Sequence, residues 1–164
     1  MTPSIRYFAG NRRVDALPDH DRGLAYGDGL FETMRAFRGG VPWWPAHWQR
    51  LQRGAQALRL TLPDENVVRA EGERLLESGD GVLKLIVTRG AGGRGYAAPT
   101  DVEPHWILSR HPLPPPAPES GLALRWCDTR LALQPALAGI KHCNRLEQVL
   151  ARSEWADPDI HEGL

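Results

Sequence analysis

The run at 112–118, Pro-Leu-Pro-Pro-Pro-Ala-Pro, most limits how this chain can fold. Proline has no backbone N–H to donate and its ring fixes φ, so this run does not fit inside a sheet or a helix. We expect a stiff, extended connection there. Fewer residues follow this connection than the ~50 that a domain with its own core usually needs. The sequence therefore predicts a first domain over 1–111, a linker over 112–120 and the first, incomplete part of a second domain over 121–164.

The first 110 residues predict an α+β domain. Glycine-containing turns between short β-rich runs indicate two hairpins, and apolar residues at spacings of three and four indicate helices. The expected hairpins pair 4–8 with 12–16 and 30–37 with 41–44; the expected helices cover 45–59 and the stretch from the cap Asp64 to Gly79; the expected central strands are 81–89 and 105–110. Beyond the linker we expect a strand at 122–127 and a helix at 142–154.

Charge and hydropathy limit the classes of partner. Acidic and basic residues balance at 20 each and no long run of one sign occurs, which argues against nucleic acid or an anionic membrane surface. No apolar run approaches the ~18 residues of a membrane span, and the first residues do not have the pattern of a signal peptide. We therefore expect a cytoplasmic protein that acts on a small molecule.

Lysine is scarce in this chain. Of the 20 basic residues, only Lys84 and Lys141 are lysines. Arginine keeps its proton and forms no imine, whereas a buried lysine can lose its proton and attack a carbonyl. Each lysine is therefore a candidate nucleophile. Lys84 lies in a β-rich run, so it can also be a plain strand residue whose ammonium reaches water.

Three polar segments are candidate functional sites, and each also has a plain structural interpretation. The segment 21–33 carries three glycines and two aspartates, and it lacks the lysine and the glycine spacing of nucleotide-binding loops. Arg50 lies at the margin of the apolar stripe of the first expected helix, where it is either solvated or able to bind a buried anion. The segment 88–96 presents Arg89 and Arg94 among four glycines, either as a mobile loop or as a carboxylate- or phosphate-binding one.

Five motifs of the chain occur in an order that one enzyme family also carries. They are Asp21-Arg22-Gly23, Gly27-Asp28-Gly29-Leu30-Phe31-Glu32-Thr33, His47-x-x-Arg50-Leu51, Thr88-Arg89-Gly90 to Gly93-Arg94-Gly95-Tyr96, and Gly139-Ile140-Lys141-His142-x-Asn144-Arg145-Leu146-Glu147-Gln148. In this order they resemble the 4-amino-4-deoxychorismate lyase family. That family belongs to the fold-type IV pyridoxal-phosphate proteins, together with branched-chain and D-amino-acid aminotransferases.

The resemblance implies a pyridoxal-phosphate-dependent lyase that converts 4-amino-4-deoxychorismate to 4-aminobenzoate and pyruvate, a step in folate biosynthesis. It implies that Lys141 is the catalytic residue and binds the cofactor covalently, that Arg50 binds the cofactor's phosphate, and that Arg94 meets a substrate carboxylate. Phe31 stands where D-amino-acid aminotransferases carry a tyrosine at the substrate, and the missing hydroxyl argues against that activity. The loop that bears Arg94 reaches the other subunit's active site in this family, so we expect a homodimer.

Members of the family continue well past position 164. The continuation carries a glutamate that faces the pyridine nitrogen, further phosphate-binding groups and most of the cofactor domain. We therefore expect little or no activity from the chain as given. Two other functions stay open: an amino-acid aminotransferase of the same fold, and a non-catalytic remnant that acts only as an interaction domain.

Overall fold

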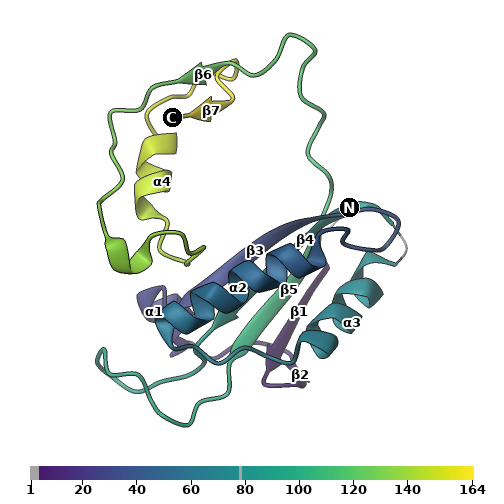
Figure 1. Ribbon diagram of the computed structural model, residues 1–164, viewed down its shortest axis with the longest axis vertical. Helices are drawn as coiled ribbons and strands as arrows, with labels where there is room; N and C mark the ends of the chain where they lie inside the picture. Colours follow the sequence, from purple (N-terminus) through teal and green to yellow (C-terminus); the bar gives the residue numbers. More distant parts are fainter. Residues whose placement is uncertain (1–3, 78) are drawn as a thin grey trace. The chain divides into compact units, whose positions relative to one another are not determined.

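A computed structural model describes residues 4–77 and 79–164 of the chain (Figure 1). The chain forms two compact units, of which the first extends to Leu113 and includes Gly139–Cys143, and the second comprises Pro114–Ala138 and Asn144–Leu164. The short segment that holds Lys141, expected in the second domain, therefore groups with the first unit. The functional roles expected of the divisions 1–111, 112–120 and 121–164 stay predictions.

The first unit is built on an antiparallel sheet with the strand order β2-β1-β5-β4-β3. The strands are β1 (Ser4–Ala9), β2 (Arg12–Val14), β3 (Gly29–Ala36), β4 (Gly81–Thr88) and β5 (His105–His111). Successive side chains of a strand point to opposite faces of a sheet. Along β4, Leu83, Leu85 and Val87 are buried, whereas the residues between them are only half-buried. One face of the sheet is thus covered and the other is open within this unit.

Two helices cover the buried face, α2 (Trp44–Leu58) and α3 (Glu65–Leu76) (Figure 1). Pro45 stands in the first turn of α2, where its missing N–H costs nothing. The Asp64 carboxylate caps α3 by accepting hydrogen bonds from the backbone N–H groups of Asn66 and Val67. The helix expected at 45–59 and the cap expected at Asp64 are therefore confirmed.

The core lies between these helices and the sheet. Its members come from both helices, from every long strand and from the loop after α2: Phe8, Leu30, Met34, Ala36, Trp44, Trp48, Leu51, Ala55, Leu60, Val68, Leu75, Leu76, Leu83, Leu85, Val87, Trp106 and Leu108. Helix α2 approaches β3 closely because Gly54 has no side chain. A Cβ atom there would lie 2.8 Å from Cδ2 of Leu30. The close approach brings the polar side chains of α2 within reach of β3.

The prediction of a second hairpin is wrong. Only an isolated bridge between Phe37 and Gly40 follows β3, and β3 pairs along its whole length with β4. Pro42 has no N–H to donate to a ladder, and the chain around it leads directly into α2. The segment 21–33 also contains a short helix that was not expected, α1 (Arg22–Tyr26).

The second unit contains short elements only. They are β6 (Leu124–Arg125), the 3-10 turn η1 (Pro135–Leu137), α4 (Leu146–Arg152) and β7 (Glu162–Gly163), with β6 and β7 parallel. The strand expected at 122–127 and the helix expected at 142–154 exist, but both are shorter. Hydrogen bonds from Thr129 and Asp128, with the charge of Arg125, lower the pKa of Glu154 to about 2. Across both units, no helix of the described residues is long and apolar enough to cross a membrane.

Candidate active site

Lys141 is fixed to the edge of the sheet by its backbone. Strand β3 is an edge strand, so one row of its N–H and C=O groups has no neighbouring strand. The N–H of Phe31 donates to the carbonyl of Lys141 at 3.0 Å, and the N–H of Cys143 donates to the carbonyl of Gly29 at 2.9 Å. A side chain at position 29 would come within 3.3 Å of the Cys143 sulfur and closer still to β4. Glycine there keeps this approach open.

Both lysines of the chain meet the same aromatic ring. Nζ of Lys141 lies 4.3 Å from the centre of the Phe31 ring, and Nζ of Lys84 lies 5.9 Å from it. Phe31 pairs with Ile86 in the sheet register, and Lys84 precedes Ile86 by two residues, so all three side chains belong to the open face. Lys84 and Lys141, the two candidate nucleophiles of the sequence, therefore both lie near the Phe31 ring.

A groove of about 520 Å³ lies on this open face. Its floor is apolar and is formed by side chains that share one row of the sheet, among them Tyr7, Ile86 and Ile107. The chain at 15–19 forms one wall, and Cys143, two residues beyond Lys141, contributes to the lining. A concave, mostly apolar site with few polar groups is the usual form of a small-molecule site.

Arg50 binds an anion on the other side of β3. Its Nε donates to Oε1 of Glu32 at 2.7 Å, and its Nη2 donates to Oε2 of the same carboxylate. His47 places Nδ1 2.8 Å from Oε2 of Glu32, which is only 1% exposed. Hydrogen bonding to Glu32 raises the pKa of Arg50 above its ordinary value. Of the two alternatives left open for Arg50, solvation or binding to a buried anion, the structure shows the second, and the anion is a carboxylate of the protein.

The ion pair with Glu32 orients Arg50 and leaves some of the N–H donors of its guanidinium unused. Glu32 occupies Nε and Nη2, while Nη1 makes no hydrogen bond to the described residues. The side chain of Arg50 is 40% exposed. A guanidinium carries five N–H donors in a fixed plane, so Arg50 keeps donors for a second anion. Its role in binding a phosphate stays a prediction.

The loop that carries Arg94 is held by Arg22, a residue that sequence reasoning did not single out. Arg22 is 4% exposed and donates to the carbonyls of Gly95 at 3.1 Å, Tyr96 at 3.1 Å and Ala97 at 3.4 Å. Its guanidinium also lies 4.9 Å from the centre of the Tyr26 ring, and Tyr26 meets Tyr96 edge-on at 5.5 Å. Arg94 itself is exposed and forms no hydrogen bond or ion pair with the described residues.

Asp28 joins this loop to the helix layer. It accepts hydrogen bonds from Nε of Arg22 at 2.9 Å and from Nε and Nη2 of Arg89 at 2.7 and 3.0 Å. Arg89 also donates to the carbonyls of Leu58 and Arg59 at the end of α2. Burial acts to raise the pKa of Asp28, but the hydrogen bonds from Arg89 and Arg22 outweigh it and lower the pKa.

Asp21 forms a second buried polar cluster beside the groove. It is 3% exposed, and its Oδ1 accepts from the N–H groups of Gly23 and Leu24, which caps α1. Its Oδ2 accepts from the Thr88 hydroxyl at 2.8 Å and lies 2.7 Å from Nδ1 of His105. The cluster fixes the start of α1, on which Arg22 stands, to strands β4 and β5.

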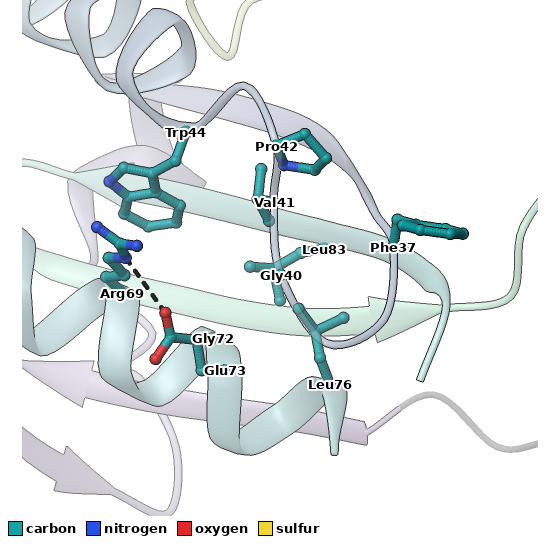
Figure 2. Close-up of a pocket in the computed structure, with 10 residues that line it drawn as sticks. All are labelled: Phe37, Gly40, Val41, Pro42, Trp44, Arg69, Gly72, Glu73, Leu76 and Leu83. Atoms are coloured by element: carbon teal, nitrogen blue, oxygen red, sulfur yellow. Dashed lines mark hydrogen bonds and ion pairs between the residues drawn. The ribbon is translucent and has the colours of Figure 1, made fainter. Parts of the chain in front are cut away.

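A smaller pocket lies at the far end of β3. It has a volume of about 190 Å³ and opens between α3 and the turn that follows β3 (Figure 2). Figure 2 shows mainly apolar side chains there, with the exposed Arg69–Glu73 ion pair at the rim. Unlike the groove, which Cys143 lines two residues from Lys141, this pocket is lined by none of the site residues predicted from the resemblance or their sequence neighbours within two positions, and no cluster of metal ligands occurs in the described part of the chain. The open face beside Lys141 is therefore the better candidate site.

Comparison with known proteins assigns this architecture to a family. The profile of the family described as amino-transferase class IV matches residues 29–164, which is most of the chain. The chain belongs to the class IV aminotransferase family. Its α+β fold is that of the fold-type IV pyridoxal-phosphate enzymes, as expected from the motifs.

Two relatives within this class are lyases. The chain is 40% identical over 144 residues to the aminodeoxychorismate lyase of Vibrio harveyi. This match covers 84% of the chain and 52% of the relative. It matches the crystal structure of 4-amino-4-deoxychorismate lyase from Pseudomonas aeruginosa with a TM-score of 0.85 and 48% identity, covering 96% of the chain and 60% of that structure. The chain thus spans about half the length of this curated relative.

A third comparison shows the fold alone. The branched-chain amino acid aminotransferase of Escherichia coli matches with a TM-score of 0.75 at 17% identity, covering 90% of this chain and 56% of that one. The fold described above therefore also occurs in an aminotransferase.

The loop contacts of this class IV protein give a first prediction. Replacing Arg22 with alanine is expected to speed tryptic cleavage after Arg94 about tenfold or more, because the loop loses several hydrogen bonds from a charged donor. The rate is measured by mass spectrometry of the 94–95 cleavage product under native conditions. Arg69→Ala, which removes only an exposed ion pair on α3, is the matched control. Equal rates in the two variants would contradict an anchoring role for Arg22.

Asp28 gives a second prediction, for pH dependence. A carboxylate whose pKa is lowered in the folded protein stabilises it above the unfolded pKa, and that contribution is lost as the pH falls through the folded pKa. Asp28→Asn is therefore expected to be less stable than the wild type at neutral pH, with the difference shrinking as the pH falls below the ordinary value of 3.8. Urea unfolding of both proteins at a series of pH values measures this. A difference that does not depend on pH would rule out the ionised form of Asp28 as its source.

Proposed function

We propose that this chain supplies the lysine and part of the substrate site of a pyridoxal-phosphate-dependent lyase. The reaction is the conversion of 4-amino-4-deoxychorismate to 4-aminobenzoate and pyruvate, which belongs to folate biosynthesis. The observation that carries the proposal is the fixing of Lys141 beside Phe31, next to an apolar groove on the open face of the sheet. Similarity to two lyases over most of the chain favours this reaction within the family.

The residues of the chain fit pyridoxal phosphate. Lys141 is held by the backbone of Phe31 and Arg50 by the carboxylate of Glu32, and these two anchors are neighbours in β3. The group that would carry the cofactor covalently and the group that would bind its phosphate are thus fixed to one short stretch of edge strand. Arg50 keeps unused donors on a charged guanidinium, which suits a phosphate.

In the proposed reaction, the step carried out by a residue of this chain is a proton transfer to Lys141. When bound, pyridoxal phosphate acts as an electron sink for the carbon that bears the substrate amine. Lys141, in its neutral form, takes the proton from that carbon. The bond between the neighbouring carbon and the ether oxygen then breaks, the enolpyruvyl group leaves with that electron pair and gains a proton to become pyruvate, and the ring becomes aromatic. No water or oxidant is consumed.

Arg94 is proposed to meet a substrate carboxylate, and the protein is proposed to be a homodimer. The exposed position of Arg94 on a loop anchored by Arg22 suits a residue that reaches into another subunit. Gel filtration with light scattering tests the dimer. A protein that stays monomeric at all concentrations would contradict the proposed homodimer.

An amino-acid aminotransferase of the same family is the second candidate, because its members share this fold. Phe31 has no hydroxyl to offer a substrate carboxylate, which argues against the D-amino-acid enzymes. The two reactions are told apart by their products, using the full-length protein with pyridoxal phosphate. Equal amounts of 4-aminobenzoate and pyruvate from aminodeoxychorismate support the lyase. Formation only of a 2-oxo acid from an amino donor supports the aminotransferase, and neither product supports a non-catalytic role.

A further inference from the structure

The small pocket at the far end of β3 has the size and the walls of a site for one aromatic ring. Its lining side chains are mainly apolar: Phe37, Val41, Pro42, Trp44, Leu76 and Leu83. In Figure 2, Val41 and Pro42 lie between Trp44 and Phe37. The pocket has a volume of about 190 Å³. An apolar cavity of about 150 Å³ is large enough to hold benzene, so a six-membered ring with one short substituent fits here.

The fold itself keeps this pocket open. Gly72 of α3 lines it, and a Cβ atom there would lie 2.9 Å from Cδ2 of Leu83. Because Leu83 is fully buried in the core, a larger residue at position 72 would push the helix away from the sheet. Trp44 is buried, and its Nε1 donates to Oε1 of Glu65 at 2.9 Å, which fixes the indole ring. The walls are thus held before any ligand arrives, as is usual for a small-molecule site.

An arginine without an anion partner stands beside this pocket. The guanidinium of Arg38 lies 4.9 Å from the centre of the Phe37 ring, and Phe37 lines the pocket. Beyond that ring contact, the Arg38 side chain forms no hydrogen bond or ion pair with residues 4–77 and 79–164. The charged residues of the lining, Arg69 and Glu73, pair with each other at 3.2 Å, and Figure 2 shows them away from Phe37. Arg38 is therefore the charge at this pocket that a ligand can pair with.

The backbone of Arg38 supports a role for its side chain. Its φ is +49°, in the left-handed region that a glycine enters without strain. Its N–H donates to Oδ1 of Asp80 at 2.8 Å, which holds the turn in place. In the described part of the chain, the other non-glycine residues with a positive φ, Arg59 and Glu77, each end a helix. The turn thus carries an arginine where glycine would fit more easily, and the guanidinium lies over a ring of the pocket.

We propose that this pocket binds a small aromatic carboxylate. The ring lies against the apolar walls, and the carboxylate pairs with Arg38, whose planar guanidinium suits that group. An uncharged ring would leave Arg38 without an anion, and a short aliphatic acid would leave the apolar walls uncovered. The pocket lies between α3 and the turn after β3, on the covered side of the sheet. It is therefore separate from the open face and does not rest on the proposed lyase function.

Benzoate is the probe for the test, added to the full-length protein with pyridoxal phosphate. The indole N–H signal of Trp44 in NMR spectra, identified by its loss in Trp44→Phe, reports binding at this pocket. Benzoate is expected to shift this signal until it saturates. Benzamide has the same ring without the charge, and it is expected to bind about fivefold or more weakly. Acetate, which has the charge without the ring, should not shift the signal at the same concentrations.

Arg38→Gln tests the charge with a residue that meets the same backbone requirement. It is expected to weaken benzoate binding about fivefold or more, to the level of benzamide, and to leave benzamide binding unchanged. Arg53→Gln, which removes another exposed arginine, is the matched control and should bind both compounds like the wild type.

Several results would overturn the assignment of this pocket. They are a Trp44 signal that benzoate does not move, equal affinity of the wild type for benzoate and benzamide, an equal shift with acetate, and equal weakening in the two arginine variants. The comparison of the three compounds needs only the wild type, so it decides the matter even if Arg38→Gln folds poorly. None of these measurements depends on turnover, so they are independent of whether the protein is a lyase.

Discussion

Replacing Lys141 with arginine is expected to abolish covalent attachment of pyridoxal phosphate to the full-length protein and to lower its lyase activity by at least about a hundredfold. Arginine keeps the positive charge beside Phe31, but it neither forms an imine nor gives up a proton at neutral pH. The backbone hydrogen bonds that fix this segment to β3 do not depend on the side chain, so the fold should survive.

Borohydride reduction in the presence of pyridoxal phosphate, followed by peptide mapping, measures the attachment. Label is expected on the peptide that contains Lys141 in the wild type and on no peptide in the variant. Lys84→Arg is the matched control for labelling, because it removes the other lysine of these 164 residues, and its label should remain on Lys141. Label on Lys84, or on neither lysine of the wild type, would refute the assignment.

Replacing Asp21 with alanine is expected to lower the free energy of unfolding by roughly 3 kcal/mol, from the loss of a cap and of hydrogen bonds to a buried charged group. The carboxylate accepts from two backbone N–H groups and from Thr88, and it also lies against His105. Alanine would leave these partners buried without an acceptor.

Asp64→Ala is the matched control, because Asp64 caps α3 in the same way but in an exposed position. Losing that cap alone should cost about 1 kcal/mol. Urea unfolding followed by circular dichroism compares the two variants. Equal losses would mean that Thr88 and His105 add nothing to the capping role of Asp21.

Helices and central strands were predictable because their signals are local. Apolar residues at helical spacing define α2, and the carboxylate of Asp64 starts α3 in the way that its sequence position indicates. The second hairpin fails for the opposite reason. Its turn at 38–40 looks like a hairpin turn, but the partner of β3 comes from β4, far along the chain, and a local pattern carries no information about that pairing.

The candidate site shows the same division. Lys141 could be proposed from its motif and from the scarcity of lysine, and Arg50 from its place at the edge of an apolar stripe. The burial of Arg22 and its hold on the loop at 95–97 could not, because the segment around it looks like a flexible glycine-rich loop. The available signal was an arginine between aspartates in a segment rich in glycine, which is consistent with a buried ion pair as well as with a solvated loop.

The attachment of the lysine segment to β3 also makes the edge of the sheet a reporter of ligand binding. The N–H groups of Phe31 and Cys143 are shielded only while residues 141–143 lie along the strand. A ligand bound to Lys141 makes detachment of residues 141–143 from β3 rarer, because binding to one conformation of a chain reduces the population of the others. Slower deuterium uptake at these two amides would therefore accompany ligand binding, and a chain that loses this segment would expose a bare strand edge to other molecules.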